Sequence, residues 1–253
     1  MKVKTTAGVL ASVKGVVAVL AFFGIVSTAS AEVVYVTYSG TVSSGFDQTG
    51  IFGRPNSSLD GEKYTASYIF DTSVGVIQNA PNYNSALGGY AFSEGAPSPS
   101  LGAILTIDGV SVGFGGGAHG QISGTDYGTY SQSFADARDY GSAYDFYTYN
   151  FVTNQMVDPS HTIPVSITEP FSYKAKNSNG GSGQGSFQIV SFRNGYGYLI
   201  DTYASLIPTT VSMSLGDGIA SGVPEPSTWA MMLIGFAGLG FAFRHSRRKV
   251  SFA

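Results

Sequence analysis

Apolar and polar residues alternate along much of the middle of the chain. In residues 33–42 and 62–70, apolar or aromatic side chains recur at every second position, and most side chains between them are hydroxylated or charged. This period of two predicts antiparallel strands with one face in a core. Outside the two ends, no stretch of a dozen residues has the 3.6-residue period of a helix. Further strands are expected at 144–152, 163–173, 184–192, 199–205 and 209–215.

Two dipeptides predict tight turns between strands. Asp108-Gly109 separates residues 101–107 from 110–114, and Asn194-Gly195 lies at the tip of a second hairpin over 191–198. Both dipeptides tolerate the positive φ angles of a type I′ turn. Short strands joined in this way predict an all-β domain, an antiparallel β-sandwich or jelly roll, over residues 32–217. Segments rich in Gly, Ser, Asn and Pro predict loops at 53–61, 78–89, 93–100 and 177–185.

The first 31 residues have the three parts of a cleavable secretory signal. Lys2, Lys4 and Lys14 precede an apolar core at 16–26, and a small-x-small site follows. That core is too short for a membrane span, which needs about 20 residues. We therefore predict a signal peptide over 1–31 with a signal helix, and signal peptidase as a partner. The cleavage site is defined by Ala29 and Ala31.

The other end holds a second short apolar segment. Residues 229–243 contain no charge, and a helix of this length would reach about 22 Å, less than the hydrocarbon core of about 30 Å. We predict a short transmembrane helix here, after a linker at 218–222. A basic tail at 244–249 would hold its end on the cytoplasmic side. The residues of this basic stop are Arg244, Arg247, Arg248 and Lys249.

The residues before the apolar segment carry a resemblance to a known family. Residues 224–230 read Pro-Glu-Pro-Ser-Thr-Trp-Ala, and the apolar segment and the Arg-rich tail follow. This order resembles the PEP-CTERM sorting signal, in its Pro-Glu-Pro-x-x-Trp-Ala variant, over 223–249. A plain C-terminal membrane anchor is the alternative interpretation. The residues of the predicted sorting motif are Pro224, Glu225, Pro226, Trp229 and Ala230.

The resemblance implies a sorting route and a partner. PEP-CTERM proteins are exported bacterial proteins handled by exosortase, a membrane-embedded, transpeptidase-like enzyme, and they are associated with exopolysaccharide production and with biofilm or surface assembly. It implies export through the inner membrane, with transient residence there, to the cell surface, the outer membrane or the extracellular space. The match covers the sorting signal, so it leaves the role of the domain between the two ends open.

Composition changes once the two ends are set aside. The chain as a whole has 13 Lys+Arg and 16 Asp+Glu, a net charge of −3. Residues 32–222 hold six basic and 15 acidic residues, so the domain has a net charge of −9. This acidic balance argues against nucleic acid as a partner. The chain has no Cys, which excludes disulfides, thiolate metal sites and Cys nucleophiles.

No residues assemble a catalytic signature. Residues 109–113 fit Gly-x-Ser-x-Gly around Ser111, but this Ser lies inside an expected strand, and glycines 115–117 follow where a nucleophile elbow needs a helix. His119 and His161 lack zinc-ligand spacing. We expect no catalytic residues, no metal site and no cofactor. Two alternatives remain for the acidic residues: a glycosidase pair, or structural Ca²⁺. The candidates are Asp126, Asp136, Asp139, Asp145 and Asp158.

Residues 136–151 form the most distinctive stretch of the domain, since aromatic residues alternate there with Asp, Asn and small residues. One set of aromatic side chains should line the core and the other could be exposed, where it would suit sugar stacking or protein contact. The simpler interpretation is that these tyrosines cover a face of the sandwich or a subunit contact. The candidate glycan contacts are Tyr140, Tyr147 and Tyr149.

Together these observations predict an exported, non-enzymatic surface or extracellular-matrix protein linked to exopolysaccharide or biofilm. Exopolysaccharide is its candidate extracellular partner. One alternative is a secreted carbohydrate-binding module that uses the exposed Tyr and Phe side chains. Another is a secreted hydrolase with an Asp pair.

Overall fold

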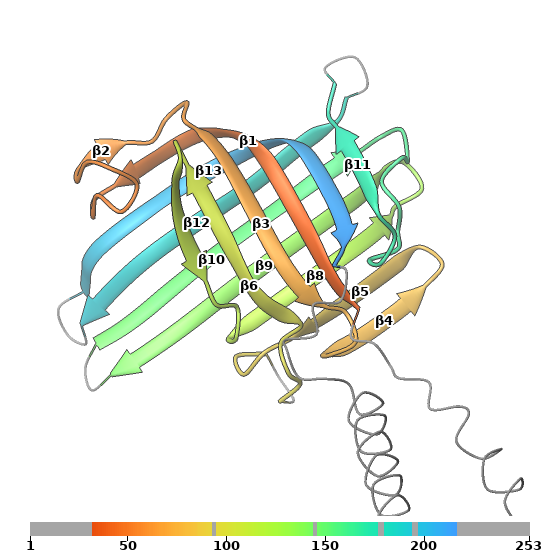
Figure 1. Cartoon of the computed structure of the whole chain (residues 1–253), viewed down its shortest axis with the longest axis horizontal. Helices are drawn as coiled ribbons and strands as arrows, with labels where there is room; N and C mark the ends of the chain where they lie inside the picture. Colours follow the sequence, from red (N-terminus) through yellow and green to blue (C-terminus); the bar gives the residue numbers. More distant parts are fainter. Residues whose placement is uncertain (1–31, 93–94, 144–145, 177–179, 194–196, 217–253) are drawn as a thin grey trace, which may run out of the picture. The chain divides into compact units, whose positions relative to one another are not determined.

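The computed structural model describes residues 32–92, 95–143, 146–176, 180–193 and 197–216, and these form strands and loops (Figure 1). The all-β prediction is confirmed. The strands are β1 (Val33–Asp47), β2 (Ser57–Ser58), β3 (Lys63–Asp71), β4 (Val76–Ala80), β5 (Tyr83–Gly88), β6 (Ser100–Ile107), β7 (Val110–Phe114), β8 (His119–Asp126), β9 (Ser131–Ala143), β10 (Phe146–Asp158), β11 (Phe171–Lys174), β12 (Ser182–Arg193) and β13 (Gly197–Leu215).

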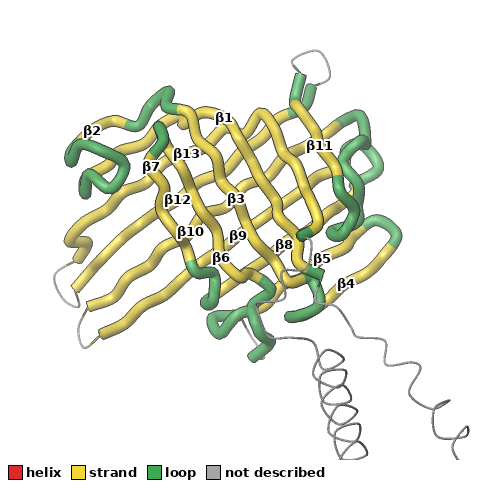
Figure 2. The backbone as a smooth tube through the Cα atoms, in the orientation of Figure 1, coloured by secondary structure: helices red, strands yellow, loops and turns green. Residues whose placement is uncertain are grey.

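The described strands belong to one antiparallel sheet. Its order is β4-β5-β8-β9-β10-β12-β13-β1-β3-β6-β7, with β11 paired to β13 and β2 paired to β1. The sheet curls, so that β1, β3 and β6 cross in front of β8, β9 and β10 (Figures 1 and 2). The finer prediction of a two-sheet sandwich or jelly roll is not confirmed, because these strands share one continuous hydrogen-bonded sheet.

Register shifts in the long central strands accompany the curl. The pairing of β1 with β13 shifts between Ser39 and Gly40, where Gly40 lies opposite Pro208. A Cβ on Gly40 would overlap the carbonyl oxygen of Ile207. The two backbones therefore approach too closely there for any residue other than glycine. Bulges of this kind bend a strand and increase its twist.

The predicted alternation places the core correctly in β1 and β3. Val34, Val36 and Tyr38 are buried, as is the face of β3 that begins at Tyr64. Opposite them, β9 and β10 supply the other wall, including Ala135. A core of this kind holds the two halves of the curled sheet together by apolar burial.

Polar side chains also join the two halves inside the core. The Tyr64 hydroxyl donates to Asn154 Oδ1 at 2.8 Å, and Asn154 Nδ2 donates to the Tyr68 hydroxyl at 2.8 Å. Tyr38 and Ser133 are hydrogen-bonded at 2.9 Å. Burial raises the pKa of the Tyr38, Tyr64 and Tyr68 hydroxyls. These groups therefore stay neutral and act as hydrogen-bonding groups of the core.

The first predicted hairpin is confirmed. β6 and β7 pair around Asp108-Gly109, whose φ angles are 46° and 82°. The second hairpin joins β12 to β13, with Arg193 paired to Gly197. Its tip at 194–196 lies outside the described residues.

Four local predictions were wrong, the first being the loop at 177–185, since β12 already begins at Ser182. Residues 163–170 are not a strand, because Pro164 and Pro170 interrupt the backbone pairing and only β11 remains. The segment 78–89 is mainly the β4–β5 hairpin, whose strand β4 is largely exposed and so has no buried face to alternate against. The expected break between 205 and 209 is bridged by β13, which carries Pro208 at the register shift with β1.

Several predicted segments lie beyond the part of the chain that the structure describes. They are the signal peptide with its cleavage residues Ala29 and Ala31, the linker at 218–222, the sorting motif at 224–230, the predicted transmembrane helix at 229–243 and the basic tail at 244–249. Within the described ranges, no helix has the length and apolar character needed to cross a membrane.

Candidate functional site

The outer face of β8, β9, β10 and β12 carries four of the residues that the sequence singled out, namely Asp136, Tyr140, Tyr147 and Tyr149. Along β9, Ser133, Ala135 and Ala137 are buried on the core side. The intervening residues face outward because successive side chains of a strand point to opposite faces. This outward series of β9 consists of Gln132, Phe134, Asp136, Arg138 and Tyr140.

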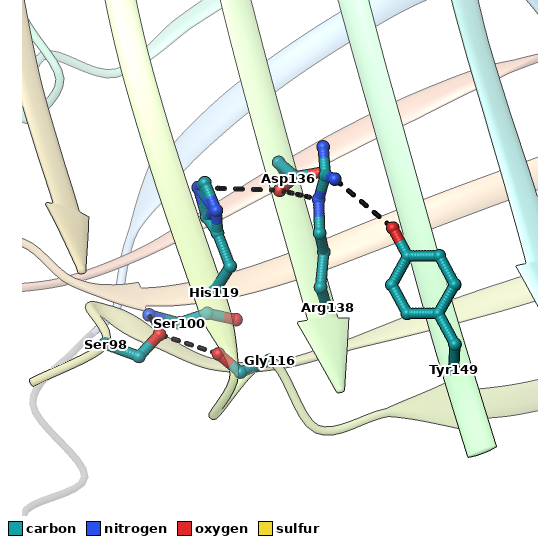
Figure 3. A network of polar contacts seen from close by, with 7 residues as sticks. All are labelled: Ser98, Ser100, Gly116, His119, Asp136, Arg138 and Tyr149. Atoms are coloured by element: carbon teal, nitrogen blue, oxygen red, sulfur yellow. Dashed lines mark hydrogen bonds and ion pairs between the residues drawn. The ribbon is translucent and has the colours of Figure 1, made fainter. Parts of the chain in front are cut away.

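Arg138 links the polar and aromatic parts of this face (Figure 3). Its Nε donates to Asp136 Oδ2 at 2.8 Å, and its Nη1 donates to the Tyr149 hydroxyl at 3.3 Å. Its guanidinium carbon lies 5.6 Å from the centre of the Phe151 ring, within cation–π range. Arg138 is thus fixed by three neighbours and holds Tyr149 in place.

Tyr140, Tyr149 and Phe151 form an aromatic strip across β9 and β10. Tyr140 and Tyr149 are direct cross-strand partners, and their rings stack at 4.8 Å with an interplanar angle of 10°. The centre of the Phe151 ring lies 5.3 Å from the centre of the Tyr149 ring. Tyr140 remains 46% exposed, so the strip is accessible from solvent. The structure therefore contains an exposed aromatic face, one of the two arrangements that the sequence allowed.

Two more tyrosines border the aromatic strip. The hydroxyl of Tyr90, a residue that is 64% exposed, donates to the Tyr140 carbonyl at 2.6 Å and accepts from the Tyr140 amide at 3.2 Å. Tyr147 is half-buried and lies two residues before Tyr149 in β10. The structure thus brings Tyr140 and Tyr149 together and places Tyr147 next along the same strand face. Sequence reasoning missed Tyr90, because it comes from a loop 50 residues earlier in the chain.

Burial dominates the electrostatics beside the aromatic strip. It raises the pKa of Asp136, which is fully buried, although the hydrogen bond from Arg138 opposes this shift. Burial also lowers the pKa of His119, whose Nε2 lies 3.8 Å from Asp136 Oδ2. The ring of Phe92 packs edge-on against His119 at 5.7 Å. The charge of Arg138 is therefore balanced locally by Asp136, beside a His that favours its neutral form.

A hollow of about 300 Å³ continues the same face toward β12. We call it the amide hollow, because Gln155 Nε2 donates to Gln132 Oε1 at 2.8 Å and Gln184 Nε2 donates to Gln155 Oε1 at 3.0 Å. Sequence reasoning missed it, since its only signal is polar residues at alternate positions of strands whose pairing was unknown. Its lining is Phe134, Thr153, Gln155, Gln184, Gly185 and Ser186.

The other acidic candidates hold loops and turns. Asp158 accepts hydrogen bonds from the backbone of Ser160 and Ile163. Asp126 lies 3.2 Å from His161 Nδ1, and Asp139 accepts from the Gly115 amide at 3.0 Å on the opposite side of β9 from Asp136. Asp145 lies outside the described residues. Across the described ranges, no group of three His, Cys, Asp or Glu side chains is placed to hold a metal ion.

Ser111 lies within a strand, as its sequence context indicates. It belongs to β7, and its hydroxyl is hydrogen-bonded to Thr106 at 2.8 Å across the hairpin. A nucleophile elbow would place this Ser on a turn between a strand and a helix. The Gly-x-Ser-x-Gly match therefore coincides with an ordinary cross-strand hydroxyl pair.

Comparison with known proteins identifies the C-terminal segment. The family model described as the PEP-CTERM protein-sorting motif matches residues 222–249, which confirms the resemblance stated for 223–249. The chain therefore carries the signal of an exported protein that exosortase sorts toward the cell surface. No curated protein and no solved structure matches the chain.

Proposed function

We propose that this protein is a non-enzymatic component of the cell surface or extracellular matrix, and that its aromatic strip binds exopolysaccharide in a biofilm. The stacked Tyr140–Tyr149 pair on the outer face of the sheet carries the proposal. The sorting motif directs the protein toward the cell surface, where an exopolysaccharide would be within its reach. Binding without catalysis agrees with a face on which Asp136 is buried and occupied by Arg138.

The chemistry of the aromatic strip suits a sugar. Tyrosine offers an apolar ring face on which a pyranose can stack and a hydroxyl that can exchange hydrogen bonds with it. Arg138 fixes Tyr149, and the stack with Tyr149 in turn fixes Tyr140, so little side-chain entropy is lost on binding. An exposed, organised aromatic patch is typical of an interaction site.

Truncating the aromatic strip should weaken glycan binding. We expect Tyr149→Ala to weaken binding of a retained polysaccharide by about tenfold or more, which corresponds to about 1.4 kcal/mol. Affinity electrophoresis of the exported protein in gels containing single polysaccharides measures this change.

The matched control for this variant is Tyr35→Ala. Tyr35 is a half-exposed tyrosine of β1, on the other half of the sheet. It should bind like the parent protein. Equal retention of all three proteins would place glycan binding elsewhere and refute the assigned site.

Deleting residues 223–253 should change where the protein is delivered. Without its sorting signal, the protein should no longer be processed or reach the surface, and immunoblots of cell fractions report both. A second variant with alanine at 224–226 keeps the apolar segment and the basic tail. This variant should also fail if exosortase reads the motif, whereas a plain membrane anchor would leave its delivery unchanged. Unaltered processing of the deletion variant would contradict the sorting route.

A further inference from the structure

The outward residues of β9 run in a line from the amide hollow to the aromatic strip. Gln132 and Tyr140 are eight residues apart, and a strand rises about 3.4 Å per residue, so the line is roughly 27 Å long. Phe134 lines the hollow at one end, and Tyr140 contributes to the strip at the other. Arg138 and Asp136 lie between the two ends. One continuous face thus offers an aromatic ring at each end and polar groups along its length.

The amide hollow provides unused hydrogen-bonding capacity. Each glutamine amide has two N–H donors and a carbonyl with two lone pairs. The ladder from Gln132 through Gln155 to Gln184 consumes one donor of Gln155 and one of Gln184, and it orients the remaining groups. Ser186 adds a hydroxyl to the same lining, whereas the Thr153 hydroxyl there already bonds Asp136. Such a set of fixed, neutral donors and acceptors is complementary to sugar hydroxyls.

The charge distribution of this face selects against an anionic ligand. Arg138 is a cation of this face, and Asp136 already neutralises it at 2.8 Å. Gln188 follows Ser186 on the same face of β12, and its Nε2 donates to the carboxylate of Asp201 at 3.2 Å, which adds a negative charge to this face. Residues 32–222 also have a net charge of −9. A polymer of uronic acids would therefore be repelled both by the face and by the whole domain.

We infer that the amide hollow and the aromatic strip form one elongated site for an extended, neutral glycan chain. This inference rests on the proposed function, because it assumes that the aromatic strip binds sugar. It adds the ligand's charge class and length, together with a second subsite around Gln155 and Gln184. A chain that spans both ends must contact the amide hollow, whereas a disaccharide reaches the aromatic strip alone.

Oligosaccharide length tests the inference directly. The probes are disaccharides, tetrasaccharides and hexasaccharides of neutral glucans, mannans and galactans, together with uronate hexasaccharides, titrated calorimetrically into the exported full-length protein. We expect the best neutral hexasaccharide to bind about tenfold or more tightly than its disaccharide, and the uronates to bind more weakly than either. Gln155→Ala should weaken the hexasaccharide by about tenfold and leave the disaccharide unchanged.

The outcomes separate the inference from the function beneath it. If neither the neutral sugars nor the uronates bind at any length, both fail. If neutral sugars bind and Tyr149→Ala weakens binding, but length and Gln155→Ala have no effect, the proposed function stands and the elongated site is refuted. Tighter binding of the uronates would overturn the charge class. An unchanged midpoint of thermal unfolding shows that Gln155→Ala is folded, and Tyr35→Ala serves as the control on the opposite half of the sheet.

Discussion

Replacing Asn154 by alanine is expected to lower the free energy of unfolding by about 3–5 kcal/mol. Asn154 is 1% exposed, accepts from the Tyr64 hydroxyl and donates to the Tyr68 hydroxyl. The substitution leaves two buried hydroxyls without these partners and creates a cavity between β3 and β10. Both effects act on the contact that joins the two halves of the curled sheet, and an unsatisfied buried polar group alone costs about 1–3 kcal/mol.

Urea unfolding of the exported protein measures this loss. Two further variants serve as a surface control and as a test of whether the cost comes from hydrogen bonds or from packing. Asn79→Ala removes an exposed asparagine of β4 and should change stability by less than about 0.5 kcal/mol. Asn154→Val combined with Tyr64→Phe and Tyr68→Phe removes all three polar partners together. This triple variant should recover much of the loss, because apolar replacement of both partners is nearly neutral. A triple variant as unstable as Asn154→Ala would assign the cost to packing and contradict the hydrogen-bond explanation.

Local sequence patterns account for the core faces and the first hairpin. The period of two in β1 and β3 predicts which side chains are buried, and Asp108-Gly109 predicts a turn that needs only its own backbone angles. The strand order depends on contacts between distant segments. Tyr64 and Asn154 are 90 residues apart, and nothing in either segment identifies its partner. The curl of a single sheet depends on such pairings, and on the close approach of Gly40 to Ile207.

Part of the candidate site can likewise be predicted from local sequence, and part depends on the pairing of distant strands. Tyr140 and Tyr149 belong to adjacent strands of one hairpin, so a sequence that alternates through 136–151 already brings them close. The amide hollow needs the register of β9, β10 and β12, because Gln132, Gln155 and Gln184 meet only after those strands pair. The burial of Asp136 could not be predicted from the sequence either. It arises from His119 and Arg138 on an outward face where a carboxylate would ordinarily be solvated.

A second carboxylate, Asp47, fixes the loop that follows β1. Its Oδ1 accepts from the Gly50 amide at 2.8 Å and from the Thr202 hydroxyl at 3.0 Å, and its Oδ2 accepts from the Phe52 amide at 2.8 Å. The loop thereby places Phe52 edge-on against Phe187 at 5.4 Å. Burial alone would raise the pKa of Asp47, but these hydrogen bonds outweigh burial and lower it below its ordinary value of 3.8.

Asp47→Asn should lower the free energy of unfolding by about 2–4 kcal/mol at neutral pH, because an amide cannot accept all of these hydrogen bonds. Since the pKa of Asp47 is lower in the folded chain than in the unfolded one, the carboxylate stabilises the fold fully above pH 3.8, and this contribution is lost as the pH falls through the folded-state pKa. Urea unfolding of both proteins from neutral pH down to about 3 should therefore show their difference shrinking only at the acidic end. Asp158 has a pKa shifted in the same direction and remains in both proteins, so it cancels from the comparison. A difference that stays constant across the whole range would show that the charge of Asp47 does not hold the loop.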